Sequence, residues 1–142
     1  MNIKILTIIG TSKHMSDIFK LRHEVFVIEQ NVPVELEIDE FDEKAIHIIA
    51  IIGNKIMGTL RILKLEDHIK IGRVAVKKPM RGLGIGTKMM EKAMRHAKKM
   101  GYNKITVDSQ VNVEGFYEKL GFQKEGDVFI DAGIPHIKMV KK

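Results

Sequence analysis

The sequence contains no cysteine, which excludes disulfide bonds, thiolate metal ligands and a cysteine nucleophile. It also has no tryptophan and only two tyrosines, so few aromatic rings are available to stack on nucleic-acid bases. No apolar run approaches the roughly 20 residues that a membrane helix needs, and the first residues lack the pattern of a signal peptide. We therefore expect a cytoplasmic protein whose chemistry does not depend on a thiol.

Size and charge are those of one soluble domain. The 142 residues, 44% apolar and 30% charged, suit a single core. The net charge of +6 is unevenly distributed, because residues 35–43 hold six carboxylates and no base whereas residues 77–99 hold eight bases and one acid. A basic nucleic-acid-binding domain is therefore one alternative, although the chain has no helix-turn-helix, RNA-recognition or zinc pattern.

Hydrophobic periodicity and glycine positions predict a mixture of strands and helices. Strands are expected at residues 3–9, 46–52, 56–65, 69–76, 104–109, 123–130 and 136–140. Helices are expected at 16–30 with Ser16 as N-cap, at 85–100 closed by Gly101, and at 112–120. The acidic segment (residues 35–43) is expected to be a loop. No repeat or linker divides the chain, which predicts one α/β domain spanning residues 1–142.

The most informative segment, residues 74–87, is typical of a strand followed by a basic glycine-rich turn and a helix start. Its alternating glycines Gly82, Gly84 and Gly86 would let a ligand approach the backbone closely. The N–H groups of the helix's first turn would then bind an anion such as a diphosphate, with Arg81 adding bidentate contacts. The order of residues excludes a P-loop, and the spacing excludes a Rossmann fingerprint.

Residues 81–86 match the Arg/Gln-x-x-Gly-x-Gly/Ala signature of the GNAT superfamily of acyl-CoA-dependent N-acyltransferases. Residues 112–122 resemble its second hallmark, an asparagine, then a tyrosine, then Gly-Phe. Residues 21–30 and 133–136 are similar to a branch of small bacterial members. The four motifs stand in the expected order along nearly the whole chain, so the resemblance extends to the complete domain.

The resemblance implies an α/β (α+β) fold of the GNAT type: a mixed, mostly antiparallel sheet of about seven strands, splayed between the fourth and fifth and flanked by helices. It also implies acetyl-CoA as cosubstrate. The pantetheine arm would enter the splay and bond the backbone of the fourth strand, and the pyrophosphate would lie on the glycine-rich turn. The residues expected to bind the cofactor are Val74, Ala75, Val76, Arg81, Gly82, Leu83, Gly84, Ile85, Gly86, Thr87 and Asn112.

The resemblance further implies direct attack of a neutral primary amine on the thioester, without an acyl-enzyme. Tyr117 matches the family's tyrosine that protonates the departing thiolate, and a phenol suits that task because it is protonated at neutral pH. The alternative is that Tyr117 only packs in the core beside Phe116. Ser109 and Gln110 are expected to position cofactor or acceptor.

The general base is not fixed by the motifs. Four side chains could accept a proton from the acceptor's ammonium group: Glu24, Glu29, Asp108 and His136. We take His136 and Glu24 as the candidate bases, although a histidine in a strand is often a hydrogen-bonded structural residue. The other five histidines lack H-x-H or HExxH spacing, so no metal site is expected.

The expected partner is a small-molecule or peptide amine. If the acidic segment steers it, the acceptor is a cation; the alternative is a solvated surface loop without a role in binding. A CoA-binding sensor without catalysis is a further alternative, because a fold does not guarantee chemistry. Neither nucleic acid nor membrane is expected as a partner. A homodimer, common in the superfamily, stays open.

Overall fold

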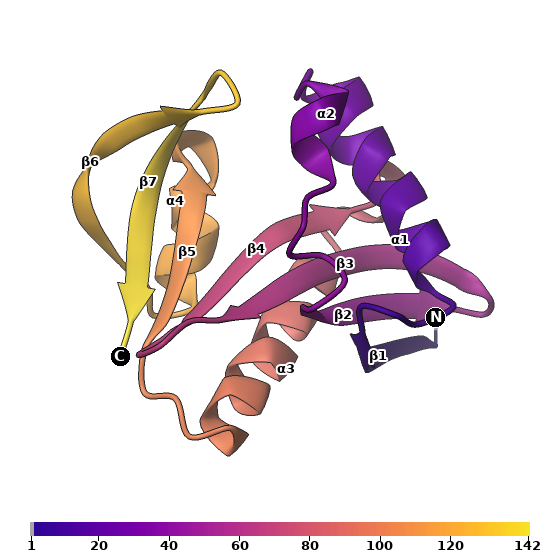
Figure 1. Cartoon of the computed structure of the whole chain (residues 1–142), viewed down its shortest axis with the longest axis horizontal. Helices are drawn as coiled ribbons and strands as arrows, with labels where there is room; N and C mark the ends of the chain where they lie inside the picture. Colours follow the sequence, from indigo (N-terminus) through magenta and orange to yellow (C-terminus); the bar gives the residue numbers. More distant parts are fainter. Residues whose placement is uncertain (1) are drawn as a thin grey trace.

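A sheet of seven strands in the order β1-β2-β3-β4-β5-β7-β6 runs through residues 2–142, the part of the chain that this computed structural model describes. All neighbouring strands are antiparallel except β4 and β5, which are parallel. Figure 1 shows two arms of the sheet, β1 to β4 and β5 to β7, that diverge from the contact between β4 and β5. The strands are β1 (Ile3–Ile9), β2 (Ile46–Ile52), β3 (Lys55–Lys64), β4 (Ile69–Val76), β5 (Ile105–Gln110), β6 (Gln123–Asp131) and β7 (Ile134–Lys141).

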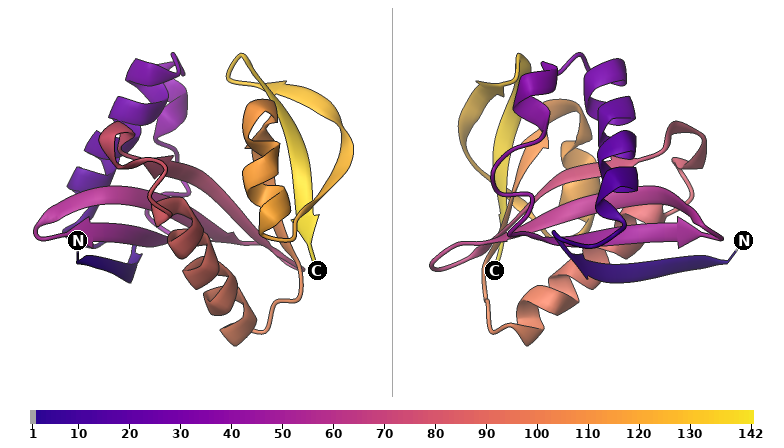
Figure 2. Two further views of the ribbon diagram at one scale, coloured as in Figure 1. Left: turned by 180° about the vertical axis from the view of Figure 1, so that it is seen from behind. Right: turned by 45° about the vertical axis from the view of Figure 1, so that its right-hand side comes forward.

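Helices cover both faces of the first arm. Figure 2 shows α1 and α3 packed against different sides of β2, β3 and β4. The helical segments are α1 (Met15–Arg22), the π-helix η1 (His23–Glu29), α2 (Val34–Glu37), the 3-10 turn η2 (Lys78–Met80), α3 (Ile85–Lys99), the 3-10 turn η3 (Val111–Val113) and α4 (Glu114–Lys119). This coverage explains why β2 is an almost continuous apolar run, since both of its faces are buried.

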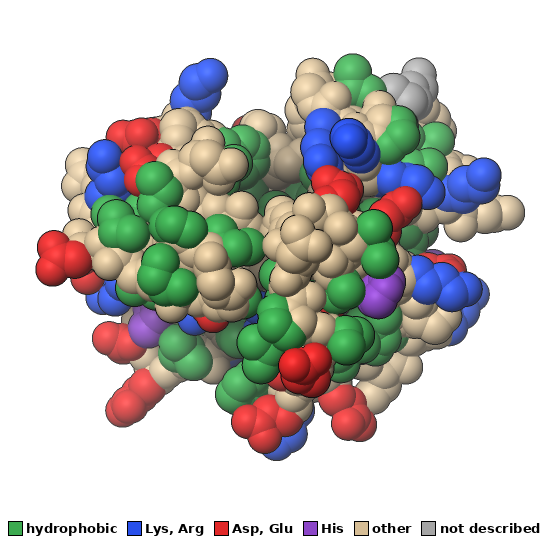
Figure 3. Space-filling view, turned by 90° about the horizontal axis from the view of Figure 1, so that it is seen from above, with side chains coloured by type: hydrophobic (Ala, Val, Ile, Leu, Met, Phe, Trp, Pro, Cys, Tyr) green, Lys and Arg blue, Asp and Glu red, His purple; other side chains and the backbone are tan. Residues whose placement is uncertain are grey.

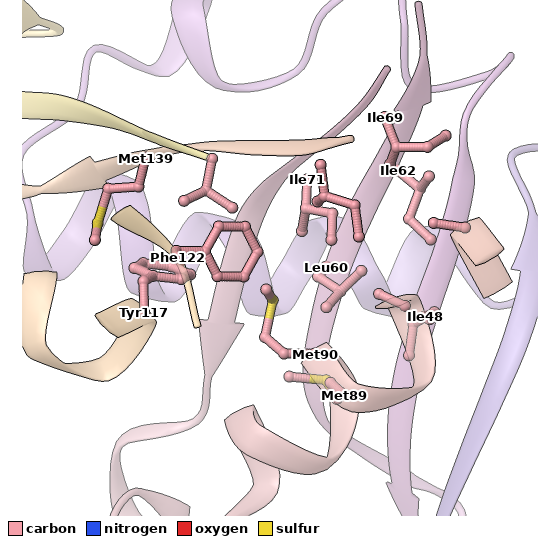
Figure 4. Close-up of a cluster of buried hydrophobic side chains, with 14 of the residues drawn as sticks. Ile48, Leu60, Ile62, Ile69, Ile71, Met89, Met90, Tyr117, Phe122 and Met139 are labelled. Carbon is pink, nitrogen blue, oxygen red and sulfur yellow. The ribbon is translucent and has the colours of Figure 1, made fainter. Parts of the chain in front are cut away.

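The main core lies between α3 and the sheet. Met89 and Met90 of α3 are fully buried against Ile48 and Leu60, as Figure 4 shows. Burial of each such side chain stabilises the fold by roughly 1.5–3 kcal/mol. A smaller cluster on the other face joins Ile49 of β2 to residues of α1. The methionines therefore fill the core, as their helical spacing predicts.

The sequence predicts most strands to within two residues, and β1, β2 and β4 have the predicted bounds. The first helix differs from the prediction. It begins at Met15 with His14 as N-cap, so the expected N-cap Ser16 lies inside the helix. From His23 the backbone widens into a π-helix, which hydrophobic periodicity does not distinguish from an α-helix.

Two other segments have a structure that differs from the prediction. Residues 112–120 form a 3-10 turn followed by the short helix α4, not one continuous helix. The acidic segment contains most of α2, although a loop was expected there. Four residues are too few to show a periodicity in the sequence, and side chains from distant parts of the chain hold this helix in place, as described below.

The predicted splay between the fourth and fifth strands is confirmed. β4 pairs with β5 only over Ile69–Ile71, whose partners are Ile105–Val107. Beyond this point β5 continues beside β7 alone, so residues 72–76 of β4 present a free edge within the described chain. The candidate site lies where the two strands part.

Candidate active site

The divergence of β4 and β5 opens a cleft of about 320 Å³. Its walls come from β4, from the end of β5, from the segment of η1 and α2, and from the turn between β6 and β7. Figure 3, which looks into the molecule from above, shows a surface hollowed between these parts. The fold thereby brings together residues from both ends of the sequence.

Tyr117 of α4 lines this cleft and is also part of the core. Only 7% of its surface is exposed, and its ring packs edge-on against Phe116 and Phe122, at centroid distances of 5.0 and 5.9 Å. Its hydroxyl has no hydrogen-bond partner among residues 2–142. Burial raises the pKa of Tyr117 to about 12, so the phenol keeps its proton at neutral pH. Tyr117 therefore both packs in the core and lines the cleft.

His136 of β7 lines the same cleft in a fixed orientation. Its Nδ1 atom lies 2.7 Å from the carbonyl oxygen of Ile134, which can only accept a hydrogen bond. Nδ1 therefore carries the proton, and Nε2 of the neutral ring is left as a proton acceptor. The ring also stacks on Phe129, its cross-strand partner, with centroids 5.8 Å apart. The hydrogen bond and the stacking together fix the orientation of the ring.

The other three candidate bases are placed differently. Asp108 lines the cleft, but its carboxylate pairs with Lys70 at 2.9 Å. Glu29 pairs with Arg81 at 2.8 Å. Glu24 is exposed and lines a separate hollow between α1 and the β2–β3 hairpin. Of the two candidate bases His136 and Glu24, only His136 lines the same cleft as Tyr117.

Ser109 and Gln110, both expected to position a ligand, have different surroundings in the structure. Ser109 is buried, and its hydroxyl donates to the backbone carbonyl of Gln110 at 2.8 Å. Gln110 lines the cleft and donates to the side-chain oxygen of Gln30 at 2.8 Å. This bond links the end of β5 to the end of η1, and sequence analysis missed it because the two residues are far apart in the chain.

Two glycines of the predicted anion loop have the backbone that such a loop requires. Gly82 and Gly84 have φ angles of 79° and 83°, and an added Cβ at either would meet no described atom within 4 Å. Gly84 is the N-cap of α3, and no side chain of the described residues caps the helix there. The first-turn N–H groups are thus open to an anion, which fits a diphosphate.

Gly86 has a packing role that the sequence did not indicate. A Cβ at this position would lie 3.3 Å from Cζ of Phe116, so the glycine allows α3 and α4 to pack closely. Ile85 is buried in the core, whereas Leu83 is exposed and Thr87 half-buried. Only the backbone of Ile85 is therefore available to a ligand.

Arg81 does not stand free in the loop. Its Nε donates to the carbonyl oxygen of Val76 at 2.9 Å, and its Nη2 donates to Glu29 at 2.8 Å. A diphosphate would have to compete with the Glu29 carboxylate for this guanidinium. Val74 lines the cleft at the free edge of β4, and the side chain of Ala75 is buried. Asn112 is exposed in η3.

The acidic segment is held by arginines, which the sequence did not reveal. Buried Arg22 binds Glu37 and Asp42, each at 2.7 Å. Arg61, 6% exposed, binds Asp42 at 3.1 Å and a second carboxylate of the segment, Asp39, at 2.7 Å. Burial is the largest single influence and would raise the pKa of Asp42, but the hydrogen bonds from Arg22 and the Asp39 backbone, together with the charges of Arg22 and Arg61, outweigh it and lower this pKa.

These ion pairs bear on both interpretations of the acidic segment, for two of its six carboxylates. Glu37 and Asp42 are neither solvated nor available to attract a cation, because arginines neutralise them inside the protein. Of the segment's six carboxylates, only three are exposed and unpaired within the described chain: Glu35, Glu40 and Glu43. The segment builds one wall of the cleft through Leu36 and Glu37.

Among residues 2–142, no helix is long and apolar enough to cross a membrane, and no group of three His, Asp or Glu side chains is placed to hold a metal ion. His47, which is almost fully buried, has its Nε2 2.9 Å from the backbone oxygen of Asp42. Burial lowers the pKa of His47, so it is a neutral structural residue at pH 7.

Comparison with known proteins agrees with this arrangement. Residues 13–142 match the protein family described as the acetyltransferase (GNAT) domain. The chain belongs to this GNAT family. It is 36% identical over 130 residues to the uncharacterized N-acetyltransferase YjcF of Bacillus subtilis. The matched segment covers 91% of this chain and 93% of YjcF. The resemblance that the motifs indicate is thus confirmed, and acyl transfer is the general activity of the family.

Solved GNAT structures share the whole fold. The crystal structure of an acyl-CoA N-acyltransferase from Pseudomonas aeruginosa superposes with a TM-score of 0.91 at 27% identity, covering 99% of this chain and 100% of that one. Escherichia coli ElaA gives a TM-score of 0.90 at 28% identity, covering 98% and 99%. The mixed seven-stranded GNAT fold is therefore established for this chain.

Proposed function

We propose that this GNAT protein is an N-acetyltransferase that moves the acetyl group of acetyl-CoA to a primary amine of a small molecule or peptide. One observation carries the proposal. A phenol without a hydrogen-bond partner among the described residues, that of Tyr117, and an imidazole with an available Nε2, that of His136, line the same cleft where the sheet splays. Nothing local in the sequence requires these two side chains to line one cleft.

The cosubstrate would bind along two adjoining features. The open backbone of Gly82 and Gly84 and the uncapped start of α3 would hold the diphosphate. The free edge of β4, Val74 to Val76, would pair with the pantetheine arm as with an added strand. Further contacts are expected from the exposed Leu83 and Asn112 and from the backbone of residues 85–87. Bound acetyl-CoA would supply an acyl group activated as a thioester.

The two side chains would divide the proton transfers. His136 would take a proton from the acceptor's ammonium group at Nε2, directly or through one water. The neutral nitrogen would then attack the thioester carbonyl, so that a C–N bond forms and the C–S bond breaks. Tyr117 would give its proton to the leaving sulfur, which is consistent with its pKa of about 12, and would regain a proton from the acylated nitrogen, which loses it to become the neutral amide.

A CoA-binding sensor is the second candidate, and the packing of Tyr117 favours it. A ring that is only 7% exposed between two phenylalanines fills space whether or not its hydroxyl reacts. In a sensor, CoA would bind the glycine-rich loop while no amine would be acetylated.

Incubation of the purified protein with acetyl-CoA and a panel of amines distinguishes these functions. Thiol release can be followed with a disulfide reagent without background, because the chain has no cysteine. Transfer to at least one primary amine, with the acetylated product seen by mass spectrometry, supports the enzyme. CoA binding without turnover on any amine supports the sensor, and absence of CoA binding contradicts both.

A further inference from the structure

Arg73 has a backbone conformation that is unusual for its position. Its φ angle is +52°, in the left-handed region that non-glycine residues with bulky side chains rarely adopt. Among residues 2–142, only Asn31 and Ala132 share this feature without being glycine, and both lie outside the strands. Arg73 lies inside β4. Such a conformation persists only where its surroundings hold it, and it is often found at functional sites.

The conformation belongs to a β-bulge at the start of the free edge. In the pairing of β3 with β4, Gly72 faces Arg61 and Ala75 faces Thr59. One residue of β3 therefore stands opposite two residues of β4, Arg73 and Val74. Pairing with β5 has just ended at Ile71. The bulge thus sets the direction of the strand where it enters the cleft.

The side chain of Arg73 ties this bulge to the end of α2. Its Nε and Nη2 donate to the carbonyl oxygen of Glu37 at 3.1 and 3.0 Å. Nη2 also lies 3.3 Å from the carbonyl oxygen of Leu36 and 3.2 Å from Oδ2 of Asp39. The last carbonyls of a helix have no partner within it, so the guanidinium satisfies α2 while it holds β4.

The contacts of Arg73 with Leu36, Glu37 and Asp39 are called the clamp below. Its partner residues are themselves held in place by ion pairs. Glu37 is itself bound by buried Arg22, and Asp39 is bound by Arg61 at 2.7 Å. Three arginines and three carboxylates of the acidic segment are thereby joined into one network of ion pairs. Movement of the bulge would require breaking the partly buried contacts of Arg73, whose partners are held by the more deeply buried Arg22 and Arg61.

We propose that Arg73 is a positioning residue for acyl transfer. Its clamp on the end of α2 fixes the bulge and so fixes the backbone of Val74, where the acyl end of the cosubstrate would meet the free edge of β4. This inference rests on the proposed function for the identity of the ligand. It assigns the acidic segment the role of an anchor for the cleft.

The variant Arg73→Gly separates the clamp from the backbone conformation. Glycine adopts a positive φ angle without strain, so the bulge can persist while the guanidinium is lost. We expect kcat to fall by about a hundredfold, as is typical when reacting groups are misplaced by about 1 Å. The affinity for CoA, measured by calorimetry, should fall much less than kcat, by no more than about tenfold, because the glycine-rich loop that would hold the diphosphate lies outside the clamp.

Calorimetric stoichiometry corrects kcat for the fraction of folded protein, so mere loss of stability would not imitate the effect. Arg73→Lys, which can keep one contact to the α2 carbonyls, should recover part of kcat. Arg95→Ala changes an exposed arginine of α3 and should leave both kcat and CoA affinity unchanged. Wild-type kcat in Arg73→Gly would overturn the proposal.

Hydrogen exchange of the peptide that covers residues 72–76, with and without acetyl-CoA, tests the clamp even if no amine is acetylated. We expect exchange in Arg73→Gly to be at least tenfold faster than in the wild type, and acetyl-CoA to protect the segment less. Equal exchange and equal protection in the two proteins would contradict the clamp. A wild type that binds acetyl-CoA without turnover would contradict the proposed enzyme and leave this measurement to decide the role of Arg73.

Discussion

Glu29 of the π-helix accepts a hydrogen bond from Arg81 of the glycine-rich loop at a distance of 2.8 Å. The same guanidinium donates to the carbonyl oxygen of Val76, so it joins the loop, the free edge of β4 and the helical segment on the other side. Arg81 therefore has a protein partner at the position where the GNAT signature leads one to expect a phosphate contact.

The Glu29–Arg81 pair predicts the effect of removing the competing carboxylate. Both side chains are partly exposed, so the pair contributes about 0.2–1 kcal/mol, and Glu29→Gln should strengthen CoA binding by no more than about fivefold. Arg81→Ala should weaken it. Calorimetry at low salt measures both changes. Weaker binding in Glu29→Gln would show that Glu29 orients Arg81 toward the ligand instead of competing with it.

The anion site at the start of α3 predicts a charge effect at Gly84. Gly84→Gln and Gly84→Glu both force a side chain onto a φ angle of 83°, so they share the backbone strain and differ only in charge. CoA should bind at least about tenfold more weakly to the glutamate variant than to the glutamine variant, because a carboxylate repels the diphosphate. Equal affinities in calorimetry would place the diphosphate elsewhere.

Burial of Tyr117 predicts a loss of stability in alkali. Its pKa is 10.0 in the unfolded chain and about 12 in the folded protein, so the protonated phenol stabilises the fold fully below pH 10. This contribution, on the order of 3 kcal/mol, should disappear as the pH rises from 10 to 12. Denaturant unfolding at several pH values should show the decline in the wild type, beyond that in Tyr117→Phe. Parallel pH profiles of the two proteins would contradict the burial of an ionisable phenol.

The buried ion pairs predict a large loss of stability when one partner is removed. Arg22→Met leaves Glu37 and Asp42 without their cation and should lower the free energy of unfolding by about 3–5 kcal/mol. The control Glu35→Gln changes an exposed carboxylate of the same segment and should stay within about 0.5 kcal/mol. Urea unfolding measures both. Similar small effects would mean that the segment is a solvated loop after all.

Sequence patterns predicted the strands well because burial leaves a strong signal. A run of isoleucines marks β2, and methionines at helical spacing mark the apolar face of α3. The motif around Arg81 shows where these elements stand in the order of the fold. The splay followed from the GNAT resemblance. Tyr117 and His136 were identified as candidates, and the cleft that both line was not visible in the sequence.

Long-range contacts and backbone conformation were not predictable in this way. The partners of Arg22 stand 15 and 20 residues away, in a segment whose charges are typical of a solvated loop. Arg73 occupies a conformation that its own side chain disfavours and only tertiary contacts hold. Gly86 has the spacing of a ligand-binding glycine, and its close packing against the ring of Phe116 could not be predicted from that spacing.

The most direct test of the proposed function is the comparison of turnover with binding in Tyr117→Phe. The substitution removes one oxygen and keeps the ring between Phe116 and Phe122, so the core should be retained. Once an acceptor amine is known, kcat should fall by about a hundredfold or more while the affinity for acetyl-CoA changes less than twofold. An unchanged kcat, under conditions where the chemical step limits the rate, would contradict the assignment of Tyr117 as the acid and leave it as a packing residue.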